Sequence, residues 1–135
     1  MELVKKDAMQ KYKTVSGKVV LGENQGRLLG FSTANIEVFS NAVPSAGIYA
    51  VIAEIGREKL KAVANLGYAP TFNRKKLILE VHIFDFFKDI YKNEMKVHFV
   101  KKLRSERKFA NSNRLVKQIK KDCEEAKRVL KAEKL

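Results

Sequence analysis

The chain has 135 residues, a length that suits a single domain. It has one cysteine, which excludes a disulfide within the chain. No apolar run approaches the roughly 20 residues of a membrane-spanning helix, and the first residues lack the apolar core of a signal peptide. We therefore expect one cytoplasmic, monomeric domain over residues 1–135 with no membrane partner. Its formal charge of +13 suits nucleic acid, an anionic surface, anionic small molecules or solvation alone.

Apolar residues and turn signals predict six strands, at 14–22, 34–39, 48–55, 60–66, 77–86 and 94–103. The tight turn at 56–59 should make the third and fourth strands a hairpin. Segments 23–32, 40–47 and 67–76 carry glycine, proline or polar residues and are expected to be loops. Strands that follow one another without intervening helices indicate an antiparallel barrel or sandwich.

The C-terminal segment has a different period. From Asn113 onward the apolar residues recur at helical spacing, and Asn111 or Ser112 could cap the first turn. The stripe consists of Leu115, Val116, Ile119, Cys123, Ala126, Val129 and Leu130. The sequence therefore predicts a mainly β fold, a small barrel with one C-terminal helix packed on it, in which Cys123 belongs to the core.

The strand at 77–86, "LILEVHIFDF", carries a carboxylate among apolar residues on both of its faces. Glu80 falls on the face of Ile78 and His82, and Asp85 on the face of Ile83. A carboxylate there is costly unless it is paired or opens onto a cavity. Partial burial raises the pKa of a carboxylate, which suits a general base. The competing interpretation is an exposed Glu80 paired with a lysine.

The segment "GRLLGFSTAN", residues 26–35, opens with a glycine turn that carries an arginine and ends in two oxygen donors. Glycines allow the backbone to approach phosphate closely, and Arg27 could contact phosphate oxygens. Thr33 and Asn35, two residues apart in extended backbone, project to one side and offer hard oxygen ligands of the kind that Mg²⁺ takes. The alternatives are a hairpin connection and local side-chain-to-backbone hydrogen bonds.

Taken together, five segments resemble the motifs of riboflavin kinases, in the family's order along the chain. "GKVVLGENQGRLLGFSTANI" is similar to the glycine loop that runs into Pro-Thr-Ala-Asn, and "SAGIYAV" to the strand that follows it. "VANLGYAPTF" resembles the Asn-Ile-Gly-x-x-Pro-Thr-Phe loop and "LEVHIFDFFKDIY" the catalytic-strand segment. "LRSERKFANSNRLVKQIKKD" is similar to the closing loop and helix. The resemblance covers residues 12 to 130 and is specific as a set.

The resemblance implies a six-stranded antiparallel Greek-key barrel with a C-terminal helix. It also implies transfer of the ATP γ-phosphate to the ribityl 5′-hydroxyl of riboflavin, which gives FMN and ADP with Mg²⁺, Zn²⁺ or Mn²⁺ as the metal. Carried over by position, Glu80 would be the base, and Thr33 and Asn35 would hold the metal. Five residues would lie along ATP: Gly22, Arg27, Ile83, Asp85 and Tyr91. Arg104, Arg107 and Phe109 would hold the flavin.

Two residues depart from the family pattern. Ser32 stands where the motif usually has proline, and Lys92 stands where a glycine often follows the tyrosine. Nothing in the chain resembles the adenylyltransferase domain of many bacterial relatives, so no FAD synthesis is expected. Two other functions are compatible with the sequence. One is a flavin- or nucleotide-binding module without turnover; the other, less favoured because most phenylalanines occupy core-like strand positions, is a basic barrel that binds single-stranded nucleic acid.

Overall fold

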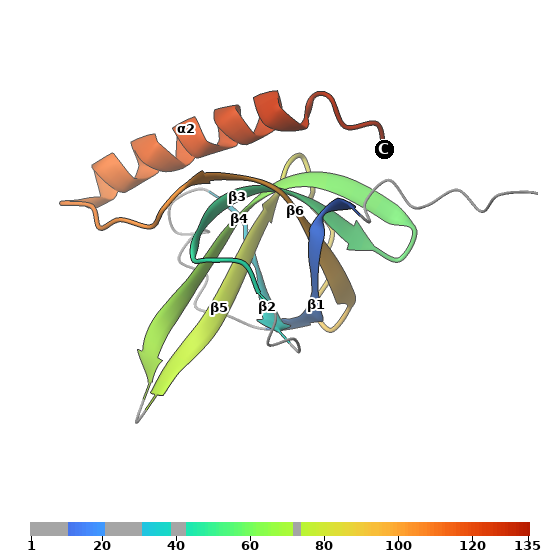
Figure 1. Cartoon of the computed structure of the whole chain (residues 1–135), viewed down its shortest axis with the longest axis horizontal. Helices are drawn as coiled ribbons and strands as arrows, with labels where there is room; N and C mark the ends of the chain where they lie inside the picture. Colours follow the sequence, from blue (N-terminus) through green and yellow to red (C-terminus); the bar gives the residue numbers. More distant parts are fainter. Residues whose placement is uncertain (1–10, 21–30, 39–42, 72–73) are drawn as a thin grey trace, which may run out of the picture.

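The structure, a computed structural model, describes residues 11–20, 31–38, 43–71 and 74–135. Within these residues there are six strands and a C-terminal helix (Figure 1). In chain order they are β1 (Lys13–Val20), β2 (Ala34–Val38), β3 (Gly47–Ile55), β4 (Glu58–Thr71), β5 (Arg74–Ile83), β6 (Glu94–Arg104) and α2 (Ser112–Leu130).

The strands close into a barrel in the order β1–β2–β5–β4–β3–β6, with β6 returning to β1. Every neighbouring pair is antiparallel. The consecutive strands β3, β4 and β5 are neighbours in the sheet. The strand that precedes them in the chain, β2, lies beside β5 at the far side of this group, which is the Greek-key arrangement. The predicted six-stranded barrel with a C-terminal helix is confirmed.

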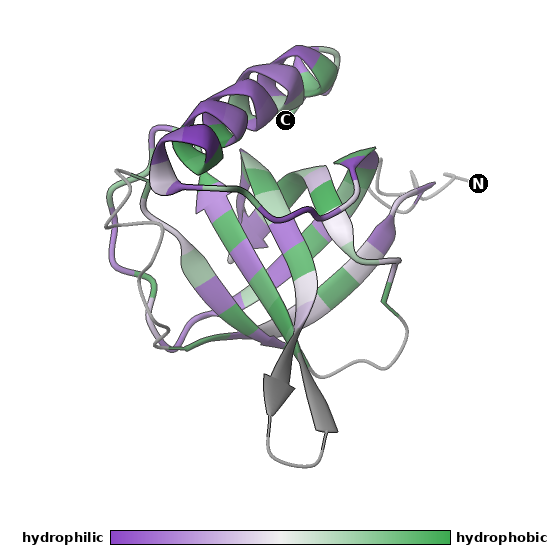
Figure 2. Cartoon of the chain, turned by 90° about the vertical axis from the view of Figure 1, so that its left-hand side faces the viewer, coloured by the Kyte–Doolittle hydropathy of each residue, from purple (hydrophilic) through white to green (hydrophobic). Residues whose placement is uncertain are grey.

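Two apolar layers stabilise this fold. Inward-facing side chains of the strands, among them Val51, Leu79 and Val97, fill the barrel. A second layer lies between the barrel and α2, where Ile52 meets Cys123 and Leu130. The strands accordingly alternate between hydrophobic and hydrophilic residues (Figure 2). The strand β3 is covered on both faces and is buried at seven successive positions, Gly47 to Ala53.

The helix α2 begins as the sequence predicts. Asn111 has extended backbone, and its side chain accepts a hydrogen bond from the backbone N–H of Arg114 at 3.0 Å. Cys123 lies in the layer against the barrel, and burial raises the pKa of its thiol. Within the described residues, none of the helical segments combines the length and the hydropathy needed to span a lipid bilayer.

Strand boundaries differ from the prediction around β4 and β5. The prediction of a loop at 67–76 is wrong, because β4 and β5 remain paired as far as Thr71 and Arg74. The pairing of β4 with β3 ends at Leu66, and no other described strand pairs with the rest of β4 on that side. A proline is tolerated at such an edge because it removes no hydrogen bond from the sheet. The resulting hairpin projects from the barrel (Figure 1). The strand β5 also ends earlier than predicted, at Ile83.

Gly17 offers a test of the barrel's close packing. A Cβ added there would lie 2.1 Å from the carbonyl oxygen of Glu37 and 2.5 Å from Cγ2 of Ile36. We expect Gly17→Ala to lower the free energy of unfolding by about 1 to 3 kcal/mol, the range for overpacking. Urea denaturation would measure it, with Ser16→Ala on the same strand as the control. Equal stabilities of the two variants would contradict the close approach.

Candidate active site

Three polar residues lie side by side across adjacent strands. Glu80 of β5 pairs directly with Asn35 of β2 on one side and with Asn65 of β4 on the other. Because Leu79 and Val81 face the barrel interior, the side chain of Glu80 lies on the outer face, where it is half-buried. Directly opposed residues have Cβ atoms about 4.5 to 5.5 Å apart. The register thus places a carboxylate between two amides.

Two clefts open beside this row. The helix-side cleft has a volume of about 530 Å³ and is lined by residues that include Thr33, Asn65, Glu80, Arg104, Arg107 and Phe109. The loop-side cleft has a volume of about 600 Å³, and its lining includes Thr33, Asn35, Ile83, Phe86, Phe87 and Tyr91. Thr33 lines both clefts. It therefore lies where a ligand in one cleft would approach a ligand in the other.

Asn35 has an unusual environment. Its side-chain oxygen Oδ1 is buried and finds no hydrogen-bond partner among the described residues. A buried acceptor without a partner costs about 1 to 3 kcal/mol, and such groups are rare in native proteins. The cost is relieved when a cation or a donor binds there. Thr33 and Asn35 together are hard oxygen donors, so the residues present fit a divalent cation. Among the described residues, no cluster of histidine, cysteine and acidic side chains offers another metal site.

The backbone before Thr33 is held by a histidine. His82 Nδ1 lies 2.6 Å from the carbonyl oxygen of Ser32, which can only accept, so Nδ1 carries the proton. The ring of His82 also contacts Phe31 and Phe84 edge to face. Ser32 thus lacks the stiffness of the proline in the family motif, but a side chain from β5 fixes its position.

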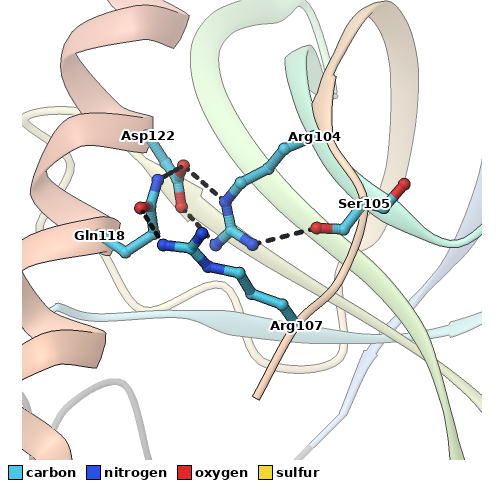
Figure 3. A network of polar contacts seen from close by, with 5 residues as sticks. All are labelled: Arg104, Ser105, Arg107, Gln118 and Asp122. Carbon is cyan, nitrogen blue, oxygen red and sulfur yellow. Dashed lines mark hydrogen bonds and ion pairs between the residues drawn. The ribbon is translucent and has the colours of Figure 1, made fainter. Parts of the chain in front are cut away.

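The far wall of the helix-side cleft is a network of arginines and helix residues (Figure 3). Arg104, at the end of β6, donates from Nε and Nη2 to both carboxylate oxygens of Asp122, at 2.9 and 2.7 Å. Its Nη1 donates to the carbonyl of Ser105 at 3.1 Å. Gln118 donates to Asp122 at 3.0 Å and accepts from Arg107 at 2.9 Å. The network joins β6, the following loop and α2.

Both guanidinium groups of this network also lie near one aromatic ring. Phe109 has Arg107 Cζ at 4.9 Å and Arg104 Cζ at 5.7 Å from its centroid. Asp122 neutralises Arg104, whereas Arg107 has the neutral partner Gln118 and keeps its positive charge beside the cleft, which Lys108 also lines. Arg104 thus supports the wall, while Arg107 can attract a ligand.

The predicted site residues separate into three sets. Thr33, Asn35 and Glu80 meet on one face, and Arg104, Arg107 and Phe109 meet in the helix-side cleft. Ile83 and Tyr91 line the loop-side cleft. Asp85 was expected on the face of Ile83, and this is wrong: it follows the end of β5 in a turn with φ of 53°, is exposed and lines neither cleft. Gly22 and Arg27 lie outside the described residues.

Five residues of the site were not anticipated: His82 as an anchor, Asn65, Phe87, Gln118 and Asp122. Asp122 had a readable signal. It falls on the buried stripe of α2 between Ile119 and Ala126 and is 6% exposed. An acidic residue on a buried stripe requires a cationic partner.

Comparison with known proteins identifies the family of the chain. The family model of riboflavin kinase (Flavokinase) matches residues 9–130. The chain belongs to the riboflavin kinase family. It is 42% identical over 116 residues to the bifunctional riboflavin kinase/FMN adenylyltransferase of Bacillus subtilis, which covers 83% of this chain and 37% of the relative. This chain therefore spans little more than a third of that relative's length.

Two solved structures share the fold. A Streptococcus pneumoniae protein described as a macrolide-efflux protein superposes with a TM-score of 0.81 at 36% identity, covering 86% of this chain and 38% of that one. The riboflavin kinase of Trypanosoma brucei superposes with a TM-score of 0.62 at 24% identity, covering 89% of this chain and 80% of that one. The second likeness supports the barrel architecture alone.

The Arg104–Asp122 pair can be tested through stability. We expect Asp122→Asn to lower the free energy of unfolding by about 3 kcal/mol, the lower part of the range for breaking a buried pair, because a largely buried guanidinium loses its counter-charge. Chemical denaturation measures this loss. The matched control is Glu125→Gln on the same helix, which breaks the exposed pair with Arg128 and should change nothing measurable. Equal effects of the two substitutions would show that the buried pair is not structural.

Proposed function

We propose that this domain transfers the γ-phosphate of ATP to the 5′-hydroxyl of riboflavin, which yields FMN and ADP. The observation that carries the proposal is the position of Thr33, shared by two clefts, beside the paired Asn35 and Glu80. Phosphoryl transfer needs alignment and charge neutralisation more than covalent chemistry. Two clefts that share the Thr33 hydroxyl, one of them also lined by the Glu80 carboxylate, provide the alignment.

In this proposal the helix-side cleft binds the flavin. Phe109 presents a flat apolar ring to the isoalloxazine, and Arg107 contributes positive charge beside it. Glu80 lines the same cleft, so the ribityl chain can bring its terminal hydroxyl to the carboxylate. Asp122 and Gln118 keep the arginines in place by the hydrogen bonds described above. The wall of the cleft is thereby formed before the substrate enters.

The loop-side cleft then binds the nucleotide, with its phosphates toward Thr33 and Asn35. The Thr33 hydroxyl and Asn35 Oδ1 would hold a divalent cation, which supplies charge neutralisation at the phosphates. The 5′-oxygen of the flavin forms a bond to the γ-phosphorus as the bond to the β–γ bridging oxygen breaks. The hydroxyl proton passes to the Glu80 carboxylate, and ADP leaves with the bonding electron pair.

Glu80→Gln tests the base. The amide keeps the size of the side chain but cannot take the proton, so the single-turnover rate should fall about 10²- to 10⁴-fold. That loss corresponds to roughly 3 to 5 kcal/mol of barrier. Affinities for riboflavin and Mg-ADP and the thermal midpoint should stay close to those of the parent. The matched control is Glu37→Gln, an exposed carboxylate on β2 that lines neither cleft.

A rate of Glu80→Gln within a few-fold of the parent would show that another group takes the proton. A parent protein that binds riboflavin and Mg-ADP but forms no FMN would support the binding module without turnover. Chromatographic separation of riboflavin from FMN measures both outcomes.

Thr33→Ala tests the metal assignment. FMN formation should stop in excess chelator, and removing the Thr33 hydroxyl should raise the Mg²⁺ concentration for half-maximal rate at least tenfold, because one of two protein ligands is lost. Thr33→Ser keeps the hydroxyl and should restore most of the Mg²⁺ response. Titration of the rate with Mg²⁺ at saturating ATP and riboflavin measures the shift. An unchanged Mg²⁺ response of Thr33→Ala would assign Thr33 a purely structural role.

A further inference from the structure

Phe87 is the most exposed large apolar side chain in the described part of the chain. It is 94% exposed, against 51% for Tyr68 and 43% for Tyr91. Leaving a phenylalanine in water forgoes the free energy of burial that stabilises most phenylalanines. A single exposed apolar residue is ordinary on a mobile surface. It is informative here because Phe87 lines a cleft and its loop is fixed.

Backbone hydrogen bonds tie this loop to the barrel. Val19 of β1 donates to the carbonyl of Asn93 at 2.9 Å and accepts from the N–H of Lys92 at 3.0 Å. Asn93 donates to the carbonyl of Ile90 at 3.0 Å. Lys92 has φ of 73°, so it adopts the left-handed backbone that a glycine takes more readily.

The side chains next to Phe87 in the loop contact the barrel. Phe86 and Ile90 pack against the core inside the barrel. Lys88 forms an ion pair with Glu58 of β4 at 3.3 Å. The loop thus buries the side chains around Phe87 or directs them to partners, while the phenyl ring of Phe87 stays at the cleft. Packing of the barrel does not require Phe87.

The lining of the loop-side cleft is of two kinds. Thr33 and Asn35 contribute polar oxygens from one segment, and Ile83, Phe86 and Phe87 contribute apolar surface from the end of β5 and its loop. A nucleoside triphosphate has the same division, with a charged phosphate chain and a flat base. Aromatic rings hold bases by stacking, because every base has a π-face.

We propose that Phe87 stacks on the purine base of the nucleotide co-substrate and sets the affinity of the loop-side cleft for it. This inference rests on the proposed function, since it takes the same cleft as the nucleotide site. It adds a residue that the family motifs do not designate. Stacking does not read the hydrogen-bonding edge of a base, so Phe87 should contribute equally to adenine and guanine nucleotides.

The first experiment removes the ring. Phe87→Ala should weaken binding of Mg-ADP and Mg-GDP by similar factors, about 5- to 100-fold, the range for loss of one stacked base. Binding of inorganic tripolyphosphate with Mg²⁺, which has no base, should not change. The control is Tyr68→Ala, a half-exposed aromatic that lines neither cleft. Calorimetric titration gives the affinities, and thermal midpoints of both variants should match the parent.

The second experiment uses the absence of tryptophan from the chain. Phe87→Trp introduces one tryptophan at the cleft and keeps a flat ring, so nucleotide affinity should be retained. Stacking with a purine should quench its fluorescence, and tripolyphosphate should leave the emission unchanged. Tyr68→Trp is the control and should respond to neither ligand.

The outcomes separate this inference from the proposed function. If Phe87→Ala binds Mg-ADP as the parent does, or loses tripolyphosphate affinity equally, base stacking by Phe87 is wrong, whether or not FMN forms. Suppose that the parent forms no FMN, but that ADP quenches the fluorescence of Phe87→Trp and tripolyphosphate does not. Base stacking by Phe87 then stands, and the proposed turnover fails.

Discussion

A shift of one residue in the pairing of β5 with its neighbours would turn Glu80 into the barrel interior, because successive side chains of a strand face opposite sides. The same shift would expose Leu79 and Val81, which fill the interior, so the apolar core maintains the observed register. The core therefore also fixes Glu80 between Asn35 and Asn65.

The second constraint is the attachment of α2 to the barrel. Apolar contacts around Cys123 and Leu130 cover one face of β3, and the Arg104–Asp122 pair joins the middle of the helix to the end of β6. Buried ion pairs contribute little net stability compared with apolar packing, but they impose a defined geometry. Here that geometry forms the wall of the helix-side cleft. Stability and the shape of the site thus come from different contacts at the same interface.

Much of this arrangement could be predicted from the sequence. Alternating apolar residues gave the six strands, helical spacing gave α2, and the Thr33–Asn35 and Glu80 segments gave three residues that the structure brings together. The extension of β4 and β5 could not be predicted, because Gly67 and Pro70 are turn signals unless the strand has a free edge. The pairing of Arg104 with Asp122 depends on how α2 docks on the barrel, and the local sequence pattern carries no information about that docking.

The shared position of Thr33 has a thermodynamic consequence. A ligand in either cleft changes the surroundings of the same hydroxyl, so occupancy of one cleft bears on the affinity of the other. In the proposed reaction, linkage makes that effect reciprocal: the factor by which the nucleotide changes flavin affinity is the factor by which the flavin changes nucleotide affinity. The pair of clefts would therefore have one coupling free energy, which states in a single number how strongly each substrate favours or opposes the binding of the other.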